Sequence, residues 1–211
     1  MAIIEHYSRN SPASLLLCSG GVESSTLLLA LHQGPVRPVF LDYGQRAADQ
    51  EWQHVQSQCQ NLALEPLRFG LADLGEELGR LRPHRFHVPM LHRNLLAISI
   101  AASAAAALAV QQIILGISAD DAVTDACSRG NFLADLGTAL GHLGLQVRTP
   151  FQDLSKQEII RFGQSLGMNW KLSYSCLLGK AQHCGQCPQC EKRRAAFAAA
   201  ALQDYDVNYA R

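Results

Sequence analysis

A glycine-rich turn near the N-terminus has the residue types and spacing of a phosphate-binding site. An apolar run of strand length, residues 15–18, ends abruptly at this turn, and leucines at helical spacing follow it through Leu31. The pattern predicts a strand, a tight turn and the N-terminus of a helix. Glycines let a ligand approach the main chain closely, and the amides at a helix start, together with the helix dipole, favour a bound anion.

The side chains of the turn suit a nucleotide phosphate with its metal ion. We expect nucleotide contacts from the whole turn, that is from Ser19, Gly20, Gly21, Val22, Glu23, Ser24 and Ser25. Serine hydroxyls can donate to phosphate oxygens, and Glu23 places a carboxylate where a magnesium ion that bridges phosphates needs a ligand. No lysine follows the glycines, so this is not a Walker-type P-loop, and the spacing differs from the dinucleotide-binding fingerprint. A turn that only caps a helix is the alternative interpretation.

Four cysteines near the C-terminus have the spacing of a metal site. Cys176, Cys184, Cys187 and Cys190 form the pattern C-x7-C-x2-C-x2-C. Thiolates at x2 spacing can reach one ion from a tight turn, and four of them close a tetrahedral structural zinc site. An iron–sulfur cluster, which also accepts four cysteines, is the alternative. We expect structural zinc here, without a catalytic role.

The elements that must position these residues alternate along the chain. Strands are expected at residues 15–18, 36–41, 66–69, 112–117 and 146–149. Helices are expected to end near residue 31, to cover 47–62, 71–81, 93–110, 131–143 and 155–166, and to begin again at Pro188. This alternation predicts an α/β fold with a doubly wound, mostly parallel five-stranded sheet. Ligands of such sheets bind beyond the carboxyl ends of the strands, where the glycine-rich turn and the loops after Leu41 and Ile117 fall.

Composition narrows the class of protein. With 211 residues, 48% of them hydrophobic and 17% charged, the chain can bury one sizeable core. We expect an α/β domain at residues 1–170 and a C-terminal helical zinc-binding region at 171–211 within the same globular unit. A formal net charge of zero argues against direct nucleic-acid binding. No uninterrupted apolar run of membrane-spanning length and no signal-peptide pattern is seen, so we expect a cytoplasmic protein without a membrane partner.

The glycine-rich turn resembles the S-G-G-x-D-S pyrophosphate loop, or PP-loop, of the ATP pyrophosphatases, which adenylate a substrate and release pyrophosphate. Glu23 stands where those enzymes usually have aspartate. Further strings, in order along nearly the entire chain, resemble the 7-cyano-7-deazaguanine synthases of queuosine biosynthesis. These strings are S-G-G-V-E-S at 19–24, L-D-Y-G-Q-R at 41–46, R-N at 93–94, G-I-S-A-D-D at 116–121, D-L-S-K at 153–156 and H-C-G-Q-C-P-Q-C-E-K-R at 183–193.

The resemblance implies an adenine nucleotide alpha hydrolase-like fold and an ATP- and zinc-dependent ligase that also uses Mg²⁺. Members of the family adenylate the carboxylate of 7-carboxy-7-deazaguanine, let ammonia displace AMP to give an amide, and use a second ATP to form the nitrile. The implied catalytic residues are Ser24, Glu23, Lys156 and Arg129. Beyond the turn, the implied nucleotide-binding residues are Tyr43, Gln45, Arg46, Arg93, Asn94, Gly116 and Asp121. A homodimer is also implied, and the small residues of the helix expected at 93–110 suit an oligomer face.

Departures from the family pattern lie where a purine-like substrate would be recognised. This chain has V-T-D-A-C-S-R at 123–129, where the family usually has S-G-Y-P-D-C-R. It lacks the family's S-A-L-T string, and the family's V-P-x-R-N string is lengthened to span 88–94. Ala47 replaces a histidine that the family usually has. One hypothesis is the nitrile synthase itself, with Asp125 and Cys127 substituting locally. A second is a relative that joins the activated carboxylate to another amine, such as a protein amine, with anti-phage defence as one setting. A nucleotide-binding subunit without turnover is the third, and the neutral charge disfavours a tRNA-acting pyrophosphatase.

Overall fold

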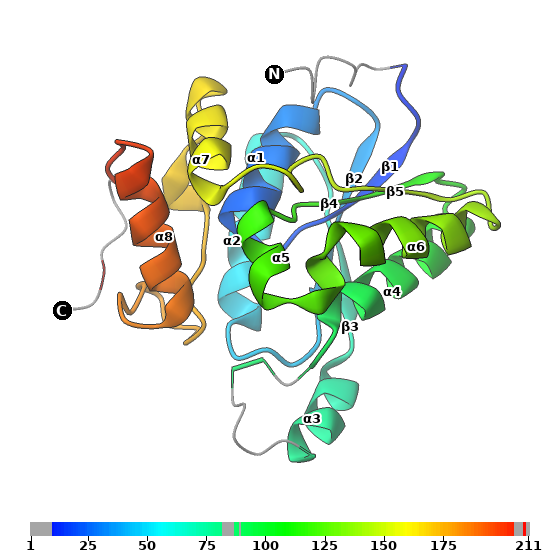
Figure 1. Cartoon of the computed structure of the whole chain (residues 1–211), viewed down its shortest axis with the longest axis horizontal. Helices are drawn as coiled ribbons and strands as arrows, with labels where there is room; N and C mark the ends of the chain where they lie inside the picture. The colour runs from blue at the N-terminus through cyan, green and yellow to red at the C-terminus, as the bar shows by residue number, and fades with distance from the viewer. Residues whose placement is uncertain (1–9, 82–86, 89, 205–208, 210–211) are drawn as a thin grey trace.

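Five parallel strands form one sheet at the centre of the protein. The computed structural model describes residues 10–81, 87–88, 90–204 and 209. The strands follow the order β3-β2-β1-β4-β5 across the sheet, and each neighbouring pair is parallel (Figure 1). Their bounds are β1 Ser14–Leu17, β2 Val36–Asp42, β3 Leu67–Gly70, β4 Gln112–Leu115 and β5 Gln146–Arg148. The predicted doubly wound, five-stranded α/β sheet is confirmed.

Helices cover both faces of this sheet because its strands are apolar on both sides. Successive residues of a strand point to opposite faces, so Leu15 belongs to one core cluster and Leu16 to the other, as do Ile113 and Ile114. Each such buried aliphatic side chain contributes about 1.5–3 kcal/mol. One cluster packs under α4 (Arg93–Ala107) and α6 (Gly130–Gly141). The other packs under α1 (Val22–Leu31), α2 (Ala48–Asn61), α7 (Lys156–Ser165) and α8 (Pro188–Ala199) (Figure 1).

The segment between β4 and α6 differs from the prediction. It was expected to be a polar loop, but it contains α5 (Ala119–Thr124) and the 3₁₀ turn η1 (Ala126–Ser128). A capping box starts α5, because the hydroxyl and the amide of Ser118 donate to the Asp121 carboxylate at 2.8 and 3.1 Å. Residues 82–86 and 89, in the segment between the helices expected at 71–81 and 93–110, lie outside the described residues.

A capping box also starts α7. The Ser155 hydroxyl accepts a hydrogen bond from the Glu158 amide, and the Ser155 amide donates to the Glu158 carboxylate at 2.8 Å. Since an N-cap serine replaced by alanine costs about 1 kcal/mol, Ser155→Ala should lower the free energy of unfolding by about that amount. Denaturant unfolding measures it, with Ser165→Ala at the other end of α7 as the control. Equal stability of the two variants would contradict this role for Ser155.

A buried arginine holds the C-terminal region together. Arg193 of α8 is 1% exposed, and its guanidinium donates to the Asp204 carboxylate at 2.7 and 2.9 Å and to the Ser173 hydroxyl at 2.9 Å. The guanidinium also donates to the Trp170 carbonyl at 3.3 Å. A buried guanidinium is tolerated only when it is paired and hydrogen-bonded in this way. Helix α8 also packs against α7. The division of the chain at residue 170 stays a prediction.

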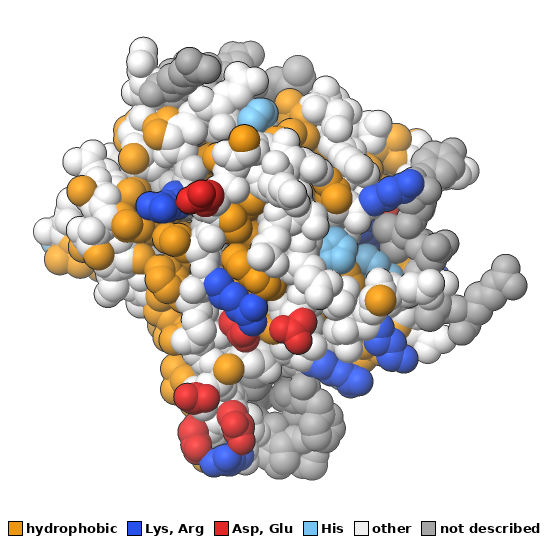
Figure 2. Space-filling view, turned by 180° about the vertical axis from the view of Figure 1, so that it is seen from behind, with side chains coloured by type: hydrophobic (Ala, Val, Ile, Leu, Met, Phe, Trp, Pro, Cys, Tyr) orange, Lys and Arg blue, Asp and Glu red, His pale blue; other side chains and the backbone are white. Residues whose placement is uncertain are grey.

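Acidic and basic side chains are interspersed over the face seen in Figure 2 rather than gathered into one basic area. The charged group at the bottom of that view lies over α3 (Ala72–Arg80), where Arg80 pairs with Glu76 at 2.7 Å and with Glu77 at 2.6 Å. In the described part of the chain, none of the helices combines the length and the apolar character that crossing a membrane requires.

Candidate active site and metal centre

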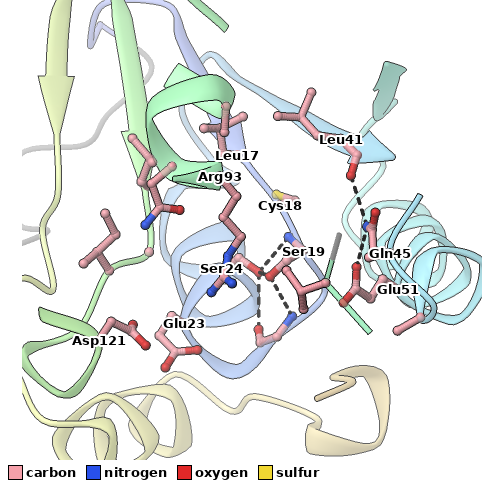
Figure 3. A pocket seen from close by; sticks show the side chains of 18 of the residues that line it. Leu17, Cys18, Ser19, Glu23, Ser24, Leu41, Gln45, Glu51, Arg93 and Asp121 are labelled. Atoms are coloured by element: carbon pink, nitrogen blue, oxygen red, sulfur yellow. Dashed lines mark hydrogen bonds between the residues drawn. The ribbon is translucent and has the colours of Figure 1, made fainter. Parts of the chain in front are cut away.

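A cavity of about 310 Å³ opens beyond the carboxyl ends of the central strands. Three strands contribute a residue at or near their carboxyl end to its wall: Leu17 of β1, Leu41 of β2 and Leu115 of β4. The glycine-rich turn, the segment after β2, the start of α4 and the loop after β4 add to the wall (Figure 3). Lys156 and residues of the C-terminal region, among them Tyr174 and Lys192, also line the cavity. The cavity therefore lies at the edge of the sheet that the topology predicts for a ligand.

The glycine-rich turn is folded around the hydroxyl of Ser24. This hydroxyl accepts from the Ser19 amide at 3.2 Å and donates to the Gly21 carbonyl at 3.3 Å. Gly20 has a φ of +73°, and a Cβ there would lie 3.1 Å from the carbonyl oxygen of Glu51, so a larger residue would be strained and crowded. No side chain caps the first turn of α1, which faces the cavity as an anion site requires.

Glu23 and Lys156 form an ion pair at the edge of this turn. The Lys156 Nζ lies 2.6 Å from Glu23 Oε1, and each side chain is 12% exposed. Burial acts to lower the pKa of Lys156, but the Glu23 carboxylate, helped by Asp121 and Asp120, raises it above its ordinary value. The ammonium is therefore charged at neutral pH. The expected metal ligand and the expected phosphate contact thus lie side by side.

Gln45 orients the half-buried carboxylate of Glu51 on the opposite part of the wall. Its side-chain oxygen accepts from the Tyr43 amide at 2.9 Å, and its side-chain nitrogen donates to the Leu41 carbonyl at 3.2 Å and to Glu51 at 2.8 Å. Burial raises the pKa of Glu51 to about 7, against the lowering effect of Gln45 and of the Arg93 charge. In Figure 3, Arg93 reaches from the start of α4 into the cavity toward Ser24.

Sequence reasoning missed Glu51. An acidic residue in the first turn of a helix is adequately explained by the helix dipole, and nothing in the sequence shows that this carboxylate faces a cavity. The hydrogen bond from Gln45, in the L-D-Y-G-Q-R string, to Glu51, six residues later, became visible only with the fold.

The altered segment after β4 contributes a polar network to the cavity wall. The Asn94 side-chain nitrogen donates to the Ser128 hydroxyl at 2.8 Å and to Asp125 at 3.3 Å, and Ser128 donates to Asp125 at 3.1 Å. All three residues line the cavity. Cys127 is buried behind them, with its sulfur 3.3 Å from His92 Nδ1, and burial raises its pKa.

Most of the expected site residues line this one cavity, and some do not. The lining residues are Ser19, Gly21, Glu23, Ser24, Tyr43, Gln45, Arg93, Asn94, Gly116, Asp121 and Lys156. Gly116 also permits close packing, since a Cβ there would lie 2.9 Å from the Glu23 Cβ. The residues outside the lining are Gly20, Val22, Ser25, Arg46 and Arg129.

Each residue outside the lining has another place in the fold. Val22 is in the core, and the Ser25 hydroxyl accepts from the buried Gln58 at 2.8 Å. Arg46 and Arg129 are exposed, so the structure does not bring them to the cavity with the other predicted contacts.

The four C-terminal cysteines converge on one point. Their sulfurs lie within 4.8 Å of one another, and all four residues are buried. Tetrahedral zinc with bonds of about 2.3 Å separates sulfurs by about 3.8 Å, and Cys184 Sγ lies 3.9 Å from Cys190 Sγ. The amides of Leu178 and Cys187 donate to the sulfurs of Cys176 and Cys184 at 3.5 and 3.2 Å, which favours thiolates. The donor set fits the predicted closed four-thiolate metal site.

This metal-binding region touches the glycine-rich turn directly. The Tyr174 amide, two residues before the first ligand, donates to the Gly20 carbonyl at 2.7 Å. The Tyr174 hydroxyl donates to the Lys180 carbonyl at 2.8 Å, inside the loop between the first two cysteines. We therefore expect a loss of structure in the metal-binding region to disturb the position of the glycine-rich turn.

Comparison with known proteins points to one family. The family described as "Queuosine biosynthesis protein QueC" matches residues 73–201. The chain is 33% identical to the 7-cyano-7-deazaguanine synthase 1 of Sulfurisphaera tokodaii over 90% of this chain and 95% of that protein. It is 31% identical to the 7-cyano-7-deazaguanine synthase of Thiobacillus denitrificans over 95% of this chain and 99% of that protein.

Solved structures of similar fold belong to enzymes of different activity. The U34-tRNA thiolase NcsA of Methanococcus maripaludis, with its [4Fe-4S] cluster, superposes with a TM-score of 0.59 at 14% identity, over 93% of this chain and 69% of that one. The NMN synthetase of Francisella tularensis gives a TM-score of 0.56 at 12% identity, over 92% of this chain and 79% of that one. These similarities support the predicted PP-loop ATP pyrophosphatase fold.

Proposed function

Because this chain belongs to the QueC family of queuosine biosynthesis proteins, we propose that it adenylates the carboxylate of 7-carboxy-7-deazaguanine and aminates it with ammonia to the amide and then to 7-cyano-7-deazaguanine. The family makes it an ATP-dependent ligase of the 7-cyano-7-deazaguanine synthase type. The observation that carries the proposal is the convergence of the glycine-rich turn, the Glu23–Lys156 pair and Arg93 on one cavity.

The start of α1 would hold the pyrophosphate of ATP. The backbone amides of the turn and the hydroxyls of Ser19 and Ser24 would donate to phosphate oxygens, and Lys156 would leave Glu23 to contact the same phosphates. Glu23 and Asp121, which lie on the same side of the cavity in Figure 3, would supply the oxygen ligands that Mg²⁺ requires. When bound, Mg²⁺ would neutralise phosphate charge.

The chemistry follows from the poor reactivity of a carboxylate. A carboxylate oxygen attacks the α-phosphorus of ATP, and the bond from that phosphorus to pyrophosphate breaks. Lys156 and Arg93 line the cavity and would stabilise electrostatically the charge that develops on the departing pyrophosphate. The acyl adenylate is then a good electrophile, so ammonia can displace AMP to give the amide, and a second ATP activates the amide oxygen for loss as the nitrile forms.

The polar network of Asn94, Asp125 and Ser128 would contact the deazapurine. A carboxylate with an amide and a hydroxyl beside it can pair with the N–H groups and the carbonyl of a guanine-like ring. These residues occupy the segment that departs from the family pattern. Their cavity-facing positions support local substitution of the usual recognition residues rather than loss of the site.

We infer that the four-cysteine site holds structural zinc. All four positions are taken by protein thiolates, so none is left for a substrate. Metal analysis of the purified protein should find about one zinc per chain and no visible absorption. Iron with acid-labile sulfide would contradict zinc.

We further infer that the protein is a cytoplasmic homodimer. Leu95 of the alanine-rich helix α4 and Leu108, just after its end, are each 38% exposed, which suits contact with a second copy. Light scattering should report twice the chain mass, and a monomer at micromolar concentration would contradict the dimer.

The altered segment also favours a second candidate, a ligase that transfers the deazapurine acyl group to another amine. Mass spectrometry of a reaction with ATP, 7-carboxy-7-deazaguanine and ammonium separates the two. The nitrile is the expected product. Pyrophosphate release that stops at the adenylate or the amide would favour the other amine, and no release from folded, metal-loaded protein would contradict both.

A further inference from the structure

Glu51 is a half-buried glutamate that lines the cavity and takes no part in the steps proposed above. It stands in the first turn of α2, and its carbonyl group lies against Gly20 of the glycine-rich turn. Figure 3 shows its side chain meeting that of Gln45 at the cavity wall. Glu51 is therefore next to the place where the nucleotide phosphates would bind.

The orientation of Glu51 is fixed by a donor that is itself fixed by the main chain. Because the Gln45 side-chain oxygen accepts from the Tyr43 amide, its nitrogen must point to Glu51 and to the Leu41 carbonyl. Gln45 is 5% exposed, so solvent does not compete for these bonds. The carboxylate is thus held at the cavity wall by a neutral hydrogen-bond donor.

The other carboxylates that line the cavity, among the described residues, have different partners. Glu23 is paired with the Lys156 ammonium, and Asp121 accepts two hydrogen bonds from Ser118. Asp125 accepts from Asn94, from Ser128 and from the amide of Cys127. Glu51, by contrast, has the neutral side chain of Gln45 as its hydrogen-bond donor, and burial raises its pKa.

Several charged and titratable groups face Glu51. Arg93 of α4 favours its charged form, whereas Asp42 of β2 disfavours it, and burial outweighs both. The Glu51 charge also acts on Tyr43 and Tyr174. Burial raises the pKa of each of these phenols, so both stay neutral. Burial raises the pKa of Glu51 to about 7, which is suited to proton transfer at neutral pH.

We propose that Glu51 accepts a proton from the ammonium ion that enters the cavity, and so releases the amine as a nucleophile beside the acyl adenylate. This inference rests on the proposed function. The proton passes from ammonium to the Glu51 carboxylate, and the nitrogen lone pair forms the bond to the acyl carbon. The bond from that carbon to the AMP oxygen breaks, the electron pair leaves with AMP, and the second proton goes to the departing phosphate. Glu51 then returns its proton to water.

The test separates adenylation from amination in Glu51→Gln, which keeps the shape and the hydrogen bond to Gln45. Pyrophosphate release that depends on 7-carboxy-7-deazaguanine should stay within about 3-fold of wild type, whereas amide formation from ammonium at neutral pH should fall about 100-fold. Amide formation by wild type should rise with pH and level off above about 7 as Glu51 ionises. In the variant it should keep rising with the supply of free ammonia.

Hydroxylamine, which is mostly unprotonated at neutral pH, should restore amination by the variant. Glu51→Asp should retain part of the ammonium-dependent rate, and Glu65→Gln, an exposed change after α2, should behave as wild type. An ammonium rate and pH profile unchanged in Glu51→Gln would overturn the inference. Equal loss of pyrophosphate release would also overturn it and make Glu51 a nucleotide contact. Absence of pyrophosphate release from wild type itself would instead remove the proposed function, and this inference with it.

Discussion

Replacing Lys156 by alanine is expected to lower substrate-dependent pyrophosphate release by about 100- to 1,000-fold, the usual loss when one preorganised charge donor is removed from an active site. The change removes the cation that faces the phosphates, and it also leaves the Glu23 carboxylate unpaired at 12% exposure beside an anion site. Both effects act against bound pyrophosphate and its developing charge.

A double variant separates these two effects. Glu23→Gln/Lys156→Ala removes the repulsion, so it should recover part of the loss seen in Lys156→Ala, and the difference measures their coupling. Lys156→Arg should retain more activity than Lys156→Ala, and Lys180→Ala, exposed and away from the cavity lining, is the matched control. Pyrophosphate release from Lys156→Ala within a few-fold of wild type would show that Lys156 only neutralises Glu23.

Cys187→Ser is expected to lose the metal and much of the stability of the chain. Folding of small metal sites is coupled to metal binding, which is worth about 10–16 kcal/mol in zinc-finger peptides. Cys187 is also the N-cap of α8, where its sulfur accepts from the Cys190 amide at 3.5 Å. We expect a loss of at least about 3 kcal/mol, which lowers the midpoint of thermal unfolding by roughly 6–12 °C.

Loss of the metal should also disturb the nucleotide site, because the Tyr174 amide donates to the Gly20 carbonyl in the glycine-rich turn. Whatever Cys187→Ser protein remains soluble should bind ATP more weakly than wild type. Metal analysis, thermal unfolding and ATP binding measure the three effects, with Cys127→Ser as the control because Cys127 is buried outside the cysteine cluster. A folded Cys187→Ser protein with its full metal content would show that Cys187 is not a ligand.

Patterns among residues that are close in sequence were sufficient to predict the strands of the sheet and the cysteine cluster. The spacing of apolar residues predicted all five strands, and Pro188 predicted the start of α8. The cysteine spacing was enough to predict the cluster, because ligands so close in sequence leave the chain few ways to fold. These features depend on neighbours within a few residues.

The rest depends on contacts between distant segments. The pairing of Glu23 with Lys156 joins α1 to α7, and no local pattern records it. Helix α5 was missed because its capping residues lie in a polar stretch without helical periodicity. Arg46 and Arg129 were grouped with the site by their strings, yet they are exposed outside the cavity, since a motif specifies residue types and not the direction of a side chain.

The central claim is that the carboxylate of the deazapurine is adenylated in this cavity, and isotope transfer tests it most directly. 7-Carboxy-7-deazaguanine labelled with oxygen-18 in its carboxylate is incubated with ATP and ammonium, and AMP is examined by mass spectrometry. If the carboxylate oxygen attacks the α-phosphorus, the oxygen that bridges carbon and phosphorus stays with AMP when ammonia displaces it, so the AMP formed with the amide carries one labelled oxygen. Unlabelled AMP formed together with the amide would contradict adenylation of this carboxylate.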